Sequence, residues 1–472
     1  MKKYKFIALF LVFYLIPGSI FPVLAAERLS TNKRFSLAAK DVSSFENSFI
    51  QNLRLIQKKQ ELQFLEDQAN FKTRGGGLEL ISASNPLLQP AALNASATLI
   101  YNWISENQKA SPLGLVASYP NDAALTNQAF TYDQALSGLL LLQQADTVTA
   151  KKIFDFYNSQ WDGSGFWTVY NTQSVNGSKV EYDKIMGPNA WIALFALKYY
   201  SKTGDANGLD LATKVGKWIK NLPHRDGGSA MGSNAFWSTK YSVENNLNYY
   251  AVLKILAVKA AIQSDRQLFV SERNGVKNWL KTQAYDAVTG LFKRGAYGDN
   301  VQAIDTNTWA ILVIGTTSLK NDFGIDVNNL VSKTEATFSV QSNGSFGHDT
   351  LTAKGFDFSD YVNASTIGRS GLKWVEGTNH FITAYKHLER YYSRPATLDT
   401  VKAAYYHNRA VYFANQNVNN RISDNNRVSY YYTDQAGAQV YADNPYWRAA
   451  SGSSVAASAW VYYSIYGLNP FI

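Results

Sequence analysis

The stretch YSVENNLNYYAVLKILAVKAA at residues 241–261 shows the theme from which most of the chain is built. It opens with a polar and acidic cluster around Glu244 and continues as a helix that is apolar on nearly all sides. A helix of that kind has to be covered on nearly all sides by other parts of the protein. The stretch therefore predicts an inner helix of a helical assembly.

The same unit recurs six times from Asn94 onward, as an amphipathic helix, a loop rich in glycine and aromatic residues, and a nearly all-apolar helix. The amphipathic helices are predicted at Ala95–Asn107, Thr147–Ser159, Gly208–Asn221, Gln267–Thr282, Val327–Phe338 and Leu398–Asn415. The apolar helices are predicted at Tyr132–Gln144, Gly187–Tyr200, Glu244–Ala261, Asp305–Leu319, Glu376–Tyr392 and Ala449–Tyr466.

Strict alternation of one-faced and fully buried helices is satisfied by two concentric rings, with the apolar set inside. The sequence therefore predicts an all-α (α/α)6 barrel, a toroid of six helical hairpins. An open superhelical stack is the alternative. Its repeats would be shorter and more uniform than these, which start about 50 to 70 residues apart.

The first residues have the pattern of a secretory signal peptide. Three lysines in the first five residues precede an apolar run, Phe6–Ile16, and small residues allow cleavage after Ala25 or Ala26. An uncleaved anchor is the alternative, but Pro17 and Gly18 interrupt the run before the roughly 20 residues that a span requires. We expect an exported protein, periplasmic or extracellular, with no membrane span after cleavage.

Three segments are predicted: a signal peptide at 1–25, an extension at 26–93, and a catalytic-type domain at 94–472. The extension contains one helix, Asn47–Phe71, and a joint of three glycines at 75–77. It could pack on the toroid or dock a partner in the cell envelope.

Composition excludes several functions. The chain has no cysteine, so it forms neither disulfides nor thiolate metal sites. The net charge of +9 includes the three signal lysines, and the basic pairs elsewhere are too short for a nucleic-acid patch. No motif calls for a cofactor or a metal ion.

Because the inner helices of a toroid point the same way, their polar starts converge on one mouth. Four acids lie there, Asp133, Glu244, Asp305 and Glu376, and they are the candidate catalytic residues. Helix capping is the alternative role of each, because acids are favoured at helix starts. Capping does not explain the asparagine and aromatic residues beside them.

Aromatic and amide side chains near the same helix starts are candidates for binding sugar, since sugar rings stack on indoles and sugar hydroxyls bond to amides. These candidates are Trp167, Trp191, Trp237, Tyr241, Asn245, Asn307, Trp309, Trp374, Asn379 and His380.

With these motifs the chain resembles the six-hairpin glycosidase superfamily, over Asn94–Phe471. The resemblance rests on the hairpin repeat and on the segments 132–136 (YDQAL), 241–247 (YSVENNL), 305–310 (DTNTWA) and 469–471 (NPF). It implies hydrolysis of glycosidic bonds in a poly- or oligosaccharide, often with inversion by two carboxyl groups about 6.5–9.5 Å apart.

On that mechanism we assign Glu244 as the general acid, because Tyr241 and Trp237 provide an apolar surround that would raise its pKa. Asp305, on the next inner helix, is the candidate base. Asp133 and Glu376 are reserves that could equally bind substrate hydroxyls.

Two other classes of function stay open. A polysaccharide lyase or sugar epimerase on the same toroid would use His or Tyr for proton transfer, and His380 follows Glu376 by one helical turn. A non-catalytic glycan-binding protein of the envelope would hold a glycan in the mouth without cleaving it.

Overall fold

The computed structural model describes residues 90–472 except 343–344, 347–348, 351–352, 418–419 and 472. The predicted signal peptide, the Asn47–Phe71 helix and the glycine joint lie outside the described residues.

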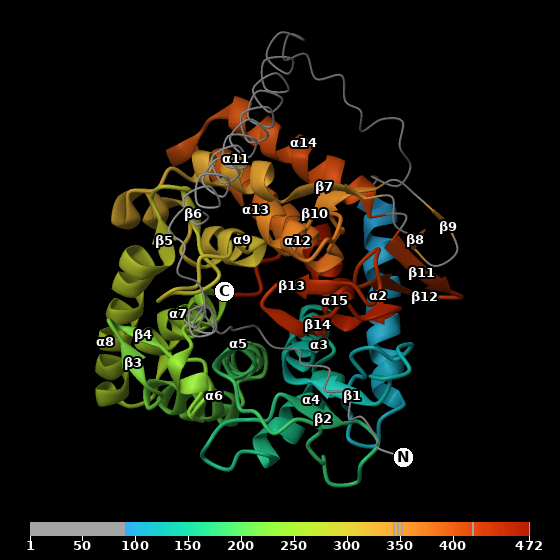
Figure 1. The fold of residues 1–472 in the computed structure, drawn as a ribbon. Helices are drawn as coiled ribbons and strands as arrows, with labels where there is room; N and C mark the ends of the chain where they lie inside the picture. The colour runs from blue at the N-terminus through green and yellow to red at the C-terminus, as the bar shows by residue number, and fades with distance from the viewer. Residues whose placement is uncertain (1–89, 343–344, 347–348, 351–352, 418–419, 472) are drawn as a thin grey trace, which may run out of the picture.

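Six helices form a closed inner ring, which Figure 1 shows around the centre of the molecule. They are α3 (Thr131–Gln143), α5 (Met186–Thr203), α7 (Val243–Lys259), α9 (Ile304–Val313), α13 (Val375–Tyr392) and α15 (Val455–Tyr466). Each packs against the inner helix before it and the one after it, and α15 packs against α3. The ring is closed as predicted, and the open stack is excluded.

Six further helices surround this ring. They are α2 (Pro90–Lys109), α4 (Thr147–Ser159), α6 (Ala206–Lys220), α8 (Gln263–Trp279), α11 (Val327–Phe338) and α14 (Thr400–Gln416), with the π-turn η4 (Leu280–Ala284) continuing α8. Four of them begin at an aspartate whose side chain accepts a first-turn N–H: α4, α6, α11 and α14. They bury one stripe each, as amphipathic helices do.

Most predicted helices fall within a few residues of the observed ones, but two predictions need correction. The last inner helix begins at Val455 and not at Ala449, because residues 444–448 and 453–454 form strands and Ser454 caps the helix. The fourth inner helix ends at Val313, because Gly315 has a φ of 86° that breaks the helix. The short helix α10 (Thr316–Ser318) and the turn η5 (Leu319–Phe323) follow it.

The loops contain short antiparallel strands that the all-helical prediction did not include. The two-stranded pairs are β1 (Gln128–Phe130) with β2 (Val169–Asn171), β3 (His224–Arg225) with β4 (Gly228–Ser229), β5 (Tyr285–Asp286) with β6 (Leu291–Phe292), β7 (Ser339–Ser342) with β10 (Ala353–Phe356), β8 (Ser345–Phe346) with β9 (Asp349–Thr350), and β13 (Gln439–Tyr441) with β14 (Asn444–Arg448). The one three-stranded sheet of the described residues orders β11 (Arg421–Asp424), β12 (Arg427–Tyr431) and β15 (Ser453–Ser454). A short helix, α12 (Tyr361–Thr366), precedes α13.

The fourth residue of every inner helix has a polar side chain that binds the backbone of the loop before that helix. In α7, Asn246 accepts a hydrogen bond from the Ser229 N–H at 2.9 Å and donates to the Ser229 carbonyl at 3.0 Å. The equivalent residues and their loop partners are Gln134 with Val116, Asn189 with Phe166, Asn307 with Phe292, Thr378 with Phe356, and Ser458 with Tyr430. We call these six side chains the loop clamps.

The first residue of every inner helix binds the next loop around the ring. The backbone N–H of Val243 in α7 donates to the Arg294 carbonyl at 2.9 Å. The same bond joins Thr131 to Thr168, Met186 to Met231, Ile304 to Phe358, Val375 to Tyr432, and Val455 to Ser118. Each loop is therefore tied to two neighbouring inner helices, and the last bond closes the circle.

Asn246→Ala should lower the free energy of unfolding by about 3 kcal/mol, because it leaves the buried N–H and carbonyl of Ser229 without partners. Urea denaturation measures the change. Asn274→Ala, at an exposed position on α8, is the matched control and should change stability by less than about 0.5 kcal/mol. Equal stability of the two variants would contradict the clamp.

Candidate active site

Three of the predicted acids share one position in consecutive inner helices. Glu244, Asp305 and Glu376 are each the second residue of α7, α9 and α13, and Tyr132 is the second residue of α3. Because helices arranged in a ring present equivalent positions to the same axis, these side chains meet at one end of the barrel. Their charges act on one another: Asp305 and Glu376 both raise the pKa of Glu244.

The four acids do not cap their helices. The residues at the N-cap positions are Phe130, Ser242, Ala303 and Trp374, and of these Ser242 has the capping side chain, which accepts from the Asn245 N–H. The loop carbonyls of the neighbouring repeats bind the first N–H groups instead. None of the four acids is therefore the N-cap residue of its helix, although Asp305 Oδ1 accepts the N–H of Thr306 in its own first turn.

Burial raises the pKa of every member of the acid cluster. Burial, followed by Asp305 and Glu376, raises the pKa of Glu244 well above its ordinary value. Burial also raises the pKa of Asp305, to about 7, while the Thr306 N–H and the Arg294 charge act in the opposite direction. Asp305 therefore has specific support for its ionised form that Glu244 lacks.

Glu376 and Asp133 also have raised pKa values. Burial raises the pKa of Glu376 to about 8, although the Tyr132 hydroxyl hydrogen bond lowers it. Burial and the nearby Glu376 raise the pKa of Asp133, and neither Asp133 oxygen makes a hydrogen bond of good geometry. The centre of the barrel thus holds acids in both protonation states near neutral pH.

A chain of polar contacts fixes Glu376. The Tyr132 hydroxyl donates to Glu376 Oε1 at 2.7 Å and accepts from Trp460 Nε1 at 2.7 Å. His380 Nε2 lies 3.4 Å from the same Glu376 oxygen. Burial lowers the pKa of His380 well below its ordinary value, so this imidazole is neutral.

One turn deeper, aromatic rings form a floor beneath the acids. Trp191, Trp309, His380 and Trp460 are each the sixth residue of an inner helix. Trp309 stacks on Trp460 with ring centres 6.2 Å apart, and the His380 and Trp460 rings are 4.2 Å apart. Phe471, near the C-terminus, packs against the Trp191 ring at 4.7 Å.

Polar atoms without hydrogen-bond partners gather around this floor. They are the carboxylate oxygens of Asp133, the amide atoms of Asn245 and Asn248, the indole N–H groups of Trp191 and Trp309, and the ring nitrogens of His380. Native interiors rarely leave such groups unpaired, because each costs about 1–3 kcal/mol. Water or a ligand rich in hydroxyl groups satisfies both donors and acceptors of this set.

Asn245 is held where only a glycine allows it. A Cβ at Gly187, the second residue of α5, would collide with the Asn245 amide oxygen. The absence of a side chain at this position of α5 leaves room for the amide.

The remaining predicted binding residues fall into two groups. The Asn307 amide is a loop clamp, and the Asn379 amide bonds to Val375, Asn417 and Ser464. Trp374 stacks on Phe358 with ring centres 4.1 Å apart. These three side chains are engaged by the protein.

The others lie in the loops that lead into α5 and α7. Trp237 and Tyr241 are buried just before α7, with the Tyr241 ring edge-on to Tyr297 at 5.0 Å. Trp167 is half-buried, and the Lys179 ammonium lies 3.9 Å from the centre of its ring. They are not part of the aromatic floor.

The acid end of the barrel is covered. Asp133, Asp305 and Glu376 are at most 8% exposed, while Glu244 is half-buried. Figure 1 shows β13 and β14 over the centre of the ring. Tyr441, at the end of β13, is close enough to Asp305 for that charge to raise its pKa, and Arg294 pairs with Asp443 between the two strands. The β13–β14 hairpin therefore lies beside the acid cluster.

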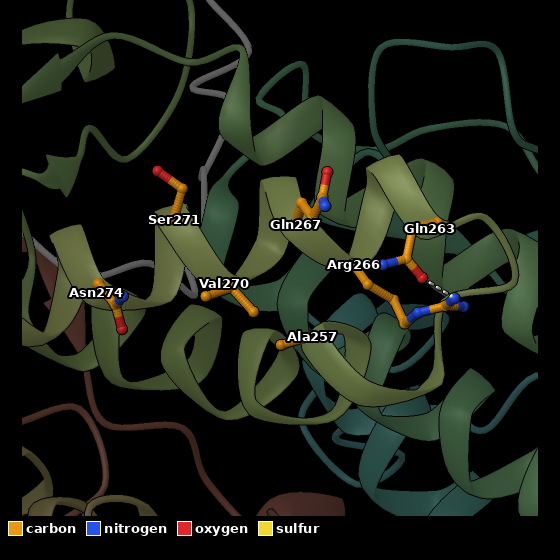
Figure 2. Close-up of a pocket in the computed structure, with 7 residues that line it drawn as sticks. All are labelled: Ala257, Gln263, Arg266, Gln267, Val270, Ser271 and Asn274. Carbon is orange, nitrogen blue, oxygen red and sulfur yellow. Dashed lines mark hydrogen bonds between the residues drawn. The ribbon is translucent and has the colours of Figure 1, made fainter.

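A surface hollow lies elsewhere, as Figure 2 shows, between α8 and the end of α7. Ala257 in its wall follows Glu244 by about 20 Å along α7 at the helical rise of 1.5 Å per residue. The hollow is not part of the acid cluster.

Within the described part of the chain, no group of three or more acidic or histidine side chains could hold a metal ion, and no helix is long and apolar enough to cross a membrane.

The closed double ring of helices defines an (α/α)6 toroid. Solved structures have this fold. A glycosidase in complex with glucose has a TM-score of 0.55 and 11% identity, covering 81% of this chain and 98% of its own. Cellobiose 2-epimerase from Spirochaeta thermophila has a TM-score of 0.56 and 11% identity, covering 81% and 96%.

A sugar epimerase from a ruminal bacterium has a TM-score of 0.55 and 9% identity, covering 79% of this chain and 98% of its own. No protein-family model and no curated protein matches the chain. The chain thus shares the fold of these glycosidase and epimerase structures, and the likeness assigns it to no family.

Glu376→Gln should stabilise the protein at neutral pH. A carboxyl whose pKa is raised to about 8 on folding takes up a proton, so it destabilises the fold increasingly as pH rises from about 4.5 to 8. Removing it should raise the free energy of unfolding by about 4 kcal/mol at pH 7.5 and have little effect at pH 4. Urea denaturation at both pH values measures this, and equal effects at both would contradict the raised pKa.

Proposed function

We propose that the protein is a glycoside hydrolase that cleaves a poly- or oligosaccharide by inversion, with Glu244 as general acid and Asp305 as general base. The observation that carries this proposal is the difference between two neighbouring acids. Glu244 is desolvated beside two other acids, whereas Asp305 receives the Thr306 N–H at 2.7 Å and feels the Arg294 charge. The same cluster therefore favours a proton on Glu244 and a charge on Asp305.

In the proposed reaction the Glu244 carboxyl protonates the glycosidic oxygen while the bond from that oxygen to the anomeric carbon breaks. Asp305 takes a proton from a water molecule, whose oxygen attacks the anomeric carbon from the opposite face. The products are a free alcohol and a sugar of inverted configuration. Glu244 is left ionised and Asp305 protonated, and proton exchange with water restores both.

The other central groups suit the binding of one sugar ring. The indole faces of the floor match the C–H faces of a sugar, and the unpaired Asn245, Asn248 and Asp133 groups match its hydroxyls. Tyr132 holds Glu376 in place through their 2.7 Å hydrogen bond. Water exclusion under the β13–β14 hairpin would strengthen each of these polar contacts.

Separate substitutions test the two assignments. Glu244→Gln and Asp305→Asn should each lower kcat at least about 100-fold, since each removes one of the two proton transfers. Asp210→Asn, which changes an exposed acid of α6, is the control and should leave kcat unchanged. Near-normal turnover in both site variants would sink the assignment.

The pH profile follows from the same pKa values. Asp305 has to be ionised, so activity should fall as pH drops below about 7. Glu244 has to be protonated, and its raised pKa keeps activity through neutral pH until an alkaline limb. A maximum at pH 4–5 in the initial rates would contradict these roles.

A sugar epimerase is the second candidate, favoured by the neutral His380 beside Glu376. Incubating the protein with α- and β-linked oligosaccharides in deuterated water separates the two reactions. Hydrolysis raises the number of reducing ends, whereas epimerisation leaves it constant and places deuterium on carbon. A lyase would give a product that absorbs in the near ultraviolet, and a glycan-binding protein would give no product.

Export to the periplasm or the medium, with cleavage after Ala25 or Ala26, is part of the same proposal. Its support is the lysine-rich, apolar and small-residue pattern of the first 26 residues. Sequencing the N-terminus of the protein recovered from a bacterial periplasm tests it. The proposed docking of an envelope partner rests on the segment 26–93 alone.

A further inference from the structure

Exposed aromatic side chains lie on one end of the barrel. Among the described residues, the large exposed aromatic side chains are Tyr182, Phe236, Tyr361 and Tyr446, which are 51–78% exposed. All four belong to segments that lead into an inner helix, at the end where the acids meet. Exposed aliphatic side chains are not restricted in this way, since Val148 lies on outer helix α4.

Tyr182 and Phe236 form one pair, before α5 and α7. Their two loops are joined by a hydrogen bond of 2.9 Å from Asn234 Nδ2 to Asp183 Oδ1. The Lys179 ammonium lies 4.8 Å from the Tyr182 ring centre, and the Lys240 ammonium lies 5.5 Å from that of Phe236. Rings beside ammonium donors suit a ligand that has both C–H faces and hydroxyl groups.

Tyr361 and Tyr446 form the second pair, before α13 and α15. Tyr361 begins α12, and the Asn363 amide of that helix bonds to Val440 and Ala442, at 3.3 and 3.1 Å. Those residues lead into β14, the strand with Tyr446. The second pair is therefore built on the hairpin that covers the acids.

The ring order places the two pairs on opposite sides of the acid cluster. Around the inner ring the helices follow the order α3, α5, α7, α9, α13, α15, so α9 separates the pairs on one side and α3 separates them on the other. Glu244, Asp305 and Glu376 begin the helices α7, α9 and α13 between the pairs. A chain that contacts both pairs has to cross the acid end of the barrel.

We propose that the two aromatic pairs are stacking subsites that hold a polysaccharide across the mouth, so that the enzyme cleaves internal linkages of a long chain. This inference rests on the proposed function, and it adds where the chain lies and which bonds are cut. Buried aromatic residues pack the core, but an exposed ring gains stability only when a ligand covers it. A polymer that continues from the central sugar is the ligand in reach of both pairs.

Binding can be tested without turnover. Native gels are cast with amylose, xylan, galactomannan or hydroxyethyl cellulose. At least one of these four polymers should retard the Glu244→Gln protein. In that background, Tyr182→Ala with Phe236→Ala should weaken binding about tenfold, and Tyr361→Ala with Tyr446→Ala should do the same. The control pair Val148→Ala with Leu398→Ala removes exposed aliphatic groups at outer helices and should leave binding unchanged.

In the active enzyme, internal cleavage should lower the viscosity of the retarding polymer well before many reducing ends appear. Cleavage of short oligosaccharides without retardation by any polymer would overturn the subsites and leave the hydrolase intact. Retardation that survives both double variants, or release of sugars only from chain ends, would also overturn them. A starting protein that is a dimer, with either double variant monomeric, would show that the rings bind a second copy of the chain instead.

Discussion

Everything at the centre of this molecule depends on a circle of hydrogen bonds between loops and inner helices. The side chain of the fourth residue of each inner helix forms hydrogen bonds with the loop before that helix. The first backbone N–H of the helix donates to the next loop around the ring. The bond from Val455 to Ser118 closes the circle, so each loop is bound to two neighbouring inner helices. The helix starts are therefore fixed relative to one another, and so are the acids at their second residues.

This arrangement explains why carboxyl groups can lie at helix starts without serving as caps. The loops satisfy the first N–H groups, so the second-residue side chains are left facing the barrel axis. Their burial destabilises the charged forms, which is the reason for the raised pKa values of Glu244, Asp305 and Glu376. Folding energy from the surrounding apolar helices offsets that cost, and the pKa values of Asp305 and Glu376, about 7 and about 8, lie near the range in which proton transfer is efficient.

The repeat itself was predictable from the sequence. Helices with one apolar face alternate with helices that are apolar on all sides, and only a few arrangements of helices can bury both kinds. Part of the site was predictable too, since three acids and Trp191, Trp309 and His380 occupy matching places in their helices. Aligning the helices on the polar fourth residue would also have revealed Tyr132, Asn248 and Trp460. The sequence did not reveal that Asn307 is a clamp, because an asparagine at a helix start has several roles.

Long-range contacts were beyond sequence reasoning for a physical reason: they join residues that no periodicity relates. The covering hairpin is one case, since the sequence predicted no strand before the helix expected from Ala449, whereas residues 444–448 pair with β13 as a strand. Arg294 is another, because its partner Asp443 lies 149 residues away. The Arg294 charge in turn lowers the pKa of Asp305.

The proposed hydrolysis predicts that the converging acids bind the positive charge that develops on a sugar as the glycosidic bond breaks. Calorimetry with a panel of protonated iminosugars at pH 6, in two buffers of different ionisation enthalpy, tests it most directly. We predict binding of at least one iminosugar with release of about one proton, because the cation ionises a buried carboxyl group. Binding should be lost in Asp305→Asn. No binding across the panel, or binding without proton release that Asp305→Asn leaves intact, would contradict the account.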